Sequence, residues 1–65
     1  MMADGVLYVE TFVDEAGEFR WRAIAHNYEV LSSSEGYGRA RDRDHNIVLN
    51  FGDGVDVRPE SPAPF

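Results

Sequence analysis

The residues with the most chemical potential lie between Ser32 and Arg43. Three consecutive serines, Ser32–Ser34, precede a segment in which arginine recurs at positions 39, 41 and 43. Serine hydroxyls and backbone N–H groups at the start of a helix, together with guanidinium groups, can hold a phosphate or a carboxylate. The sequence therefore nominates an anion-binding site made of Ser33, Ser34, Arg39 and Arg43.

Two observations favour a structural interpretation of the same residues. On a helix, Arg39 and Arg43 share one face whereas Arg41 points elsewhere, so the three guanidinium groups do not converge. The glycine-rich loop that cradles phosphates in nucleotide-binding proteins is also absent from the sequence. The competing interpretation has the serines cap the helix N-terminus and the arginines pair with Asp42, Asp44 and nearby acids.

A second cluster surrounds the tryptophan. Trp21 is flanked by Arg20 and Arg22, which could suggest a stacking platform for single-stranded nucleic acid. Successive side chains of a strand alternate between faces, so both arginines face away from Trp21. The tryptophan shares its face with Phe19 and Ala23, and we expect it in the core. A net charge of −6 also opposes phosphate binding, so we expect no nucleic-acid partner.

The remaining titratable residues form no recognisable catalytic or metal set. His26 falls in a predicted turn and His45 on the polar side of a predicted helix, and neither lies near a paired nucleophile. Two histidines without cysteine are too few for a zinc site unless carboxylates contribute. Glu35 beside Tyr37 is better interpreted as a helix-start cap or a structural hydrogen bond. We therefore expect no catalytic residue, metal or cofactor, and we lean against an enzyme.

Three predicted strands and one helix must position these side chains. Alternating or β-branched apolar residues predict strands at 5–13, 19–25 and 28–33. The connection at 14–18 reads as a hairpin loop in which Gly17 suits a positive φ. His26-Asn27 reads as a tight turn, because asparagine tolerates the left-handed region. These strands form an antiparallel meander.

A helical period begins at Arg39 and places Ala40, Ile47 and Phe51 on one stripe. Val48 lies beside this stripe, and Asp44 falls within it as an unfavourable polar residue. A Gly-Asp-Gly sequence at 52–54 ends the helix. Alternation then predicts a short fourth strand at Val55–Arg58, followed by a proline-rich flexible tail at 59–65.

This ordered set of features resembles the YegP-like family of small uncharacterised bacterial and archaeal proteins. The resemblance spans about residues 6–58 and rests on the strand at 19–22, the turn and the segment before the Ile47 helix. The matching motif residues, which we interpret as structural, are Trp21, Asn27, Ser34, Glu35, Gly36 and Tyr37. The chain departs from the family at Asn27-Tyr28, where Asn-Gly is usual. It also has Asn50 where an apolar residue is expected, and Phe51 can substitute by a slight rotation.

The resemblance implies an α+β fold with a β-β-β-α-β unit, in which the antiparallel meander packs on one helix. Single-copy members look like dimers that share one sheet and exchange the final strand, which here would be Val55–Arg58. The family brings no established activity. We accordingly expect one domain at 1–58 and a non-enzymatic homodimeric binding or accessory module. The alternative is a small enzyme or anion-ligand binder that uses the Ser32–Arg43 region.

Size and composition support a dimer in the cytoplasm. A chain of 65 residues gains only ~3–5 kcal/mol from its own core, and without cysteine it has no disulfide to add stability. No apolar run approaches the ~18 residues of a membrane span. The N-terminus also lacks the basic and apolar regions of a signal peptide.

The charge balance predicts a salt-adapted, haloarchaeal source. Twelve acidic residues stand against six arginines, and the sequence contains no lysine. Self-repulsion at this charge density weakens as salt screens it. We therefore expect the melting temperature to rise between low and molar KCl. Equal melting temperatures in the two salts would contradict the prediction.

Overall fold

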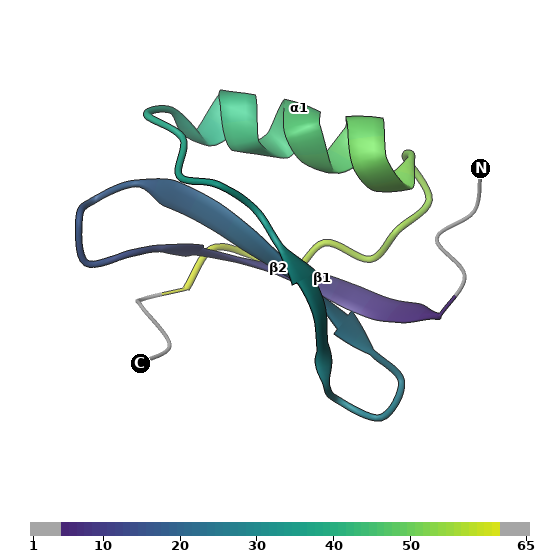
Figure 1. Cartoon of the computed structure of the whole chain (residues 1–65). Coiled ribbons are helices and arrows are strands. Elements are labelled where there is room, and N and C mark those ends of the chain that lie inside the picture. Colours follow the sequence, from purple (N-terminus) through teal and green to yellow (C-terminus); the bar gives the residue numbers. More distant parts are fainter. Residues whose placement is uncertain (1–4, 62–65) are drawn as a thin grey trace.

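In the computed structural model, which describes residues 5–61, three strands precede one helix. The elements are β1 (Val6–Val13), β2 (Phe19–Ala25), β3 (Val30–Ser33) and α1 (Ala40–Phe51). The strands form an antiparallel sheet in the order β1-β2-β3, and α1 lies across one face of it (Figure 1). The predicted α+β class and the antiparallel meander followed by one helix are confirmed.

The core lies between α1 and the sheet. It consists of Val9, Trp21, Ala23 and Ile47, with Val6, Phe51 and Val55 packed against them. The Trp21 ring meets the Phe51 ring edge-on, with centroids 5.0 Å apart. Its indole N–H donates to the Asn46 side-chain oxygen at 2.8 Å, so the buried nitrogen is satisfied. Trp21 is therefore a core residue, as its position on the strand predicts.

The helix is rotated relative to the predicted stripe. Its buried residues are Arg43 and Ile47, whereas Asp44 faces solvent and Val48 is 45% exposed. Arg43 can occupy an inward position because its guanidinium lies over the Phe19 ring, 5.5 Å from the centroid. This rotation removes the unfavourable acid from the core-facing stripe.

The predicted serine cap of the helix is wrong. Arg39 is the N-cap residue, and no side chain among the described residues caps it. The serine run instead extends the sheet: the Ser34 hydroxyl accepts from the Trp21 N–H at 2.9 Å and donates to the Glu35 carbonyl at 2.8 Å. The chain continues along β2 as far as Tyr37, which pairs with Phe19. The serines therefore lie beside the sheet, and the helix begins later, at Ala40.

The turn between β2 and β3 places positive φ one residue later than predicted. Tyr28 has φ 67°, and among residues 5–61 it is the one non-glycine with positive φ. Asn27 acts through its side chain, which accepts from the Glu29 N–H at 3.2 Å. The tyrosine thus occupies the position at which glycine is favoured, since a Cβ in the left-handed region is strained.

The segment after α1 lies along the outer edge of β1. Val57 and Ser61 form isolated parallel bridges with Val9 and Phe12. The predicted strand at Val55–Arg58 is therefore reduced to one bridging point at Val57, and it folds back on its own chain. The first residues of the predicted 59–65 tail take part in this contact, while residues 62–65 lie outside the described part of the chain.

We predict that Tyr28→Gly stabilises the protein by about 0.5–1 kcal/mol. Removing the Cβ relieves ~1–2 kcal/mol of left-handed strain, which exceeds the ~0.4–1 kcal/mol entropic cost of glycine in the unfolded chain. Little packing is lost, because Tyr28 is 72% exposed. Urea denaturation measures the difference. Tyr28→Ala is the control, since alanine keeps the Cβ; an equal gain in that variant would contradict the strain argument.

Candidate functional site

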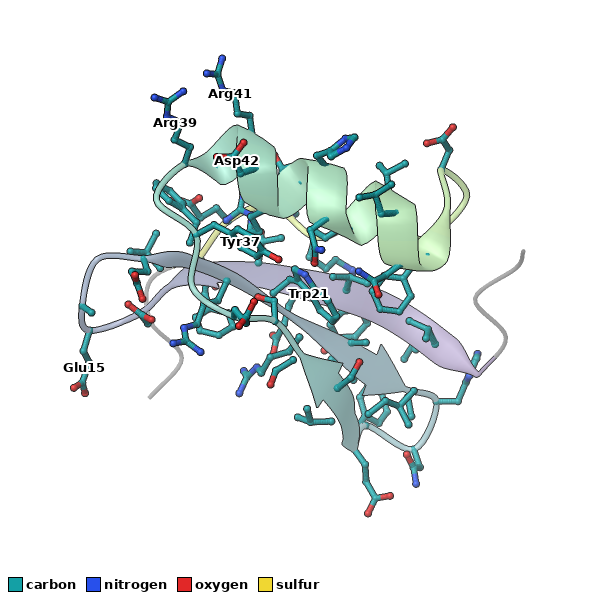
Figure 2. All side chains as sticks on the ribbon, turned by 45° about the horizontal axis from the view of Figure 1, so that its top comes forward. Glu15, Trp21, Tyr37, Arg39, Arg41 and Asp42 are labelled. Atoms are coloured by element: carbon teal, nitrogen blue, oxygen red, sulfur yellow. The ribbon has the colours of Figure 1, made fainter. Side chains whose placement is uncertain are left out.

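The structure separates the residues of the predicted anion site. Arg43 is buried in the helix–sheet interface, and the Ser34 hydroxyl is bonded within the sheet. Arg39 is exposed and, like Arg41, projects away from the sheet (Figure 2). Ser33 pairs with Arg22 of β2, which puts it on the sheet face opposite α1. The four nominated residues therefore point in different directions.

A different set of polar residues comes together on the sheet face that α1 leaves open. An open hollow of about 520 Å³ lies there. Its lining residues are Phe12, Asp14, Glu15, Ala16, Arg20, Arg22 and Ser33. The register explains the grouping, because Phe12 is opposite Arg20 and Arg22 is opposite Ser33 on adjacent strands.

Carboxylates balance both arginines of this hollow. Arg20 Nε donates to Asp14 Oδ2, and Arg22 Nη2 donates to Glu10 Oε1. The Arg22 guanidinium also lies over the Phe12 ring, 5.1 Å from the centroid. Its Nε is buried and, within residues 5–61, has no hydrogen-bond partner. The hollow therefore combines locally paired charges with one buried N–H that has no acceptor among these residues.

The alternation of residues in the sequence predicts that Arg20 and Arg22 share one face of β2. Which residues of the neighbouring strands lie beside them, here Phe12 and Ser33, depends on strand register, and no local pattern in the sequence indicates it. Within residues 5–61, no group of three or more histidine or acidic side chains could hold a metal ion. No helix in this part of the chain is long and apolar enough to cross a membrane.

Asp14 organises the hairpin at the end of the hollow. Its Oδ1 accepts the N–H groups of Ala16 and Glu18, both at 2.9 Å. The bond from the Glu18 N–H is the main cause that lowers the pKa of Asp14 below its ordinary value of 3.8, and the Arg20 guanidinium and the Ala16 N–H add to it. Partial burial acts in the opposite direction. The ionised carboxylate is thus the form that holds the β1–β2 turn.

We predict that Asp14 contributes to acid denaturation. Because its folded-state pKa is lowered, its contribution is present above the unfolded value of 3.8 and is lost as the pH falls through the folded value. Asp14→Asn should destabilise the protein near neutral pH and flatten the loss of stability below about pH 4. Urea denaturation across this pH range measures both effects. Glu15→Gln, in the same hairpin, is the control, and an identical pH profile for the two variants would refute the assignment.

Comparison with known proteins identifies the family of the chain. A family model described as a domain of unknown function, DUF1508, matches residues 14–52. This region contains β2, β3 and α1. It excludes β1 and the segment after the helix. No solved structure matches the chain.

Curated relatives carry the name UPF0339 and are bacterial. Two proteins from Neisseria meningitidis, one of serogroup B and one of serogroup A, are each 37% identical over 43 residues, which cover 66% of this chain and 77% of each relative. A protein of Agrobacterium fabrum is 61% identical over 28 residues, covering 43% of this chain and 45% of its own. These bacterial relatives lend no support to the haloarchaeal source that the charge balance predicts. The family model matches more than half of the chain, and the protein therefore belongs to the DUF1508 family of uncharacterised, YegP-like proteins.

Proposed function

We propose that the protein is a non-enzymatic, cytoplasmic accessory module that works as a homodimer formed by exchange of the segment after α1. The observation that carries the proposal is that this segment bonds to the outer edge of β1 through parallel bridges. Val9 N–H donates to Asp56 O and Arg58 N–H donates to Val9 O, both at 2.8 Å, and Ser61 N–H donates to Thr11 O at 3.1 Å. An intermolecular copy of these bonds would have the same geometry, so exchange costs little.

The connection from α1 to this segment is suited to a hinge. Gly52 ends the helix with φ 80°, and a turn at 53–54 follows it. Glycine at both ends of this connection allows the chain to leave the helix in more than one direction. Opening the hinge would let the segment reach the β1 edge of a second copy, which joins the two sheets side by side.

A second copy would also add buried apolar surface to a chain whose own core is small. The apolar surface left in water includes Val57, Leu31 and Leu49, which are 43%, 54% and 69% exposed. These side chains lie on different elements, and covering any of them with a second copy would remove apolar surface from water. A dimer buries part of this surface and raises stability through mass action.

The alternative is an anion-ligand binder or small enzyme that uses the Ser32–Arg43 region. Its specific support is the unpaired Arg22 Nε near Ser33, but Asp14 and Glu10 already neutralise the two arginines of the hollow. No nucleophile–base pair accompanies them in the described residues. Titration with phosphate, followed through amide chemical shifts, separates the alternatives: saturable shifts at 33–43 would favour the anion site over the accessory module.

We predict a dimer in sedimentation experiments from low to high micromolar concentration. Arg58→Pro removes the N–H that donates to Val9 O, so it should detach the segment from β1 in both the closed and the exchanged form and leave an open monomer. Arg58→Ala keeps this N–H and serves as the control. A strict monomer at high micromolar concentration would overturn the proposal, as would a proline variant that loses stability without any change in its concentration dependence.

A further inference from the structure

We infer that a groove at the C-terminal end of α1 is a docking site for an extended basic segment of a partner protein, with an aliphatic residue between two cationic ones. This inference rests on the proposed binding role and names its partner. It is independent of the exchanged dimer. In the structure one chain supplies the whole groove, whereas in an exchanged dimer Val55 and Val57 would come from the other copy. The groove has a volume of about 270 Å³, and its lining residues are Asp44, Ile47, Val48, Gly52, Asp53, Val55 and Val57.

The interior of the groove is aliphatic. Ile47, a core residue, is only 2% exposed, while Val48 and Val57 are 45% and 43% exposed. These valines present methyl groups to water beside the closed core, so an apolar side chain entering between them is favoured. The volume falls below the ~300–1,000 Å³ typical of small-molecule pockets and suits one or two side chains. The size therefore favours a peptide anchor over a metabolite.

The rim of the groove is negative. Asp44 is 56% exposed and pairs with Arg43, whose guanidinium also pairs with Glu60 at 3.0 Å. One cation shared by two carboxylates leaves this cluster with a net negative charge. Asp53 is exposed just beyond the helix, and the last turn of α1 contains no basic residue.

The helix itself adds to this potential. Carbonyl groups at the C-terminus of a helix carry a partial negative charge, and here that end lies at the groove. Arg39 and Arg41 stand at the opposite end of α1 and point into solvent (Figure 2). The net charge of −6 reinforces the local field, because it accelerates encounters with cationic partners.

Two acids that line an aliphatic groove define the partner. Asp44 of α1 and Asp53, just after the helix, both line the groove together with Ile47, Val48, Val55 and Val57. A segment that fits therefore presents cationic side chains and an aliphatic one on the same side. In an extended chain, a central residue and the residues two before and two after it share one side. The matching pattern is basic-x-aliphatic-x-basic.

The test uses the full chain, labelled with ¹⁵N, and an acetylated, amidated peptide Gly-Lys-Thr-Leu-Thr-Lys-Gly. We expect saturable amide shifts concentrated in residues 44–57. One control peptide has glutamate in place of both lysines, and the other has alanine in place of leucine; both should bind more weakly. Absence of saturable shifts, or equal binding of all three peptides, would overturn the inference.

Variants of the protein locate the contact. Changing Asp44 and Asp53 together to Asn should weaken binding about fivefold, the expected effect of losing two exposed ion pairs, and should reduce its salt dependence. Val57→Thr, which keeps the shape and removes apolar character, should also weaken binding. Asp42→Asn, in the first turn of α1, is the matched control. Weakening by this control equal to that of the double variant would refute the site.

Sedimentation of the same samples distinguishes the two proposals. A dimer that does not bind the lysine peptide would refute the groove and leave the exchanged dimer standing. A monomer that binds the peptide at 44–57 would refute the exchange and leave the groove standing.

Discussion

The structure depends on the contacts of one side chain, because Trp21 is the point at which the sheet and the helix are joined. Its ring packs edge-on against Phe51, and its indole nitrogen donates to Asn46, so it contacts the helix in two ways. Its backbone bonds to Ser34 through both the amide and the carbonyl, which extends the third strand along β2. A sheet with a single covering helix has little redundancy, and these contacts set where α1 can lie.

Arg43 is the second constraint on the arrangement. Burying a guanidinium is costly unless its charge is paired and its N–H groups are bonded. Here the Phe19 ring, Asp44 and Glu60 share that role. Because Glu60 lies between the bridging residues Val57 and Ser61, this cation also ties the chain after α1 to the helix. An exchanged segment would carry its glutamate with it, so the ion pair would form between the two chains.

The two open surfaces of the molecule differ in character for a physical reason. On the exposed sheet face, alternation brings arginines of β2 beside acids of β1 and of the hairpin, so each charge is paired locally. At the end of α1, the last turn of the helix contains no basic residue and Asp53 is exposed. An acidic chain thus has one nearly neutral hollow and one negative groove with an aliphatic floor, and the latter is better suited to recruit a cationic partner.

The sequence by itself determined the elements, their order and the family. Alternation in the strands, the 3.6-residue period of the helix and the glycines that end elements are local signals, and they predicted the meander, the helix and the core position of Trp21. The tertiary structure decided which helix residues face inward, because Arg43 enters the core only when Phe19 and Glu60 are close enough to stabilise it. It also decided that Ser34 serves the sheet and that Tyr28 takes the left-handed position. Strand register groups Arg22 with Ser33, and packing between distant segments decides which edge the chain after α1 occupies. Local sequence patterns contain no information about contacts between distant segments.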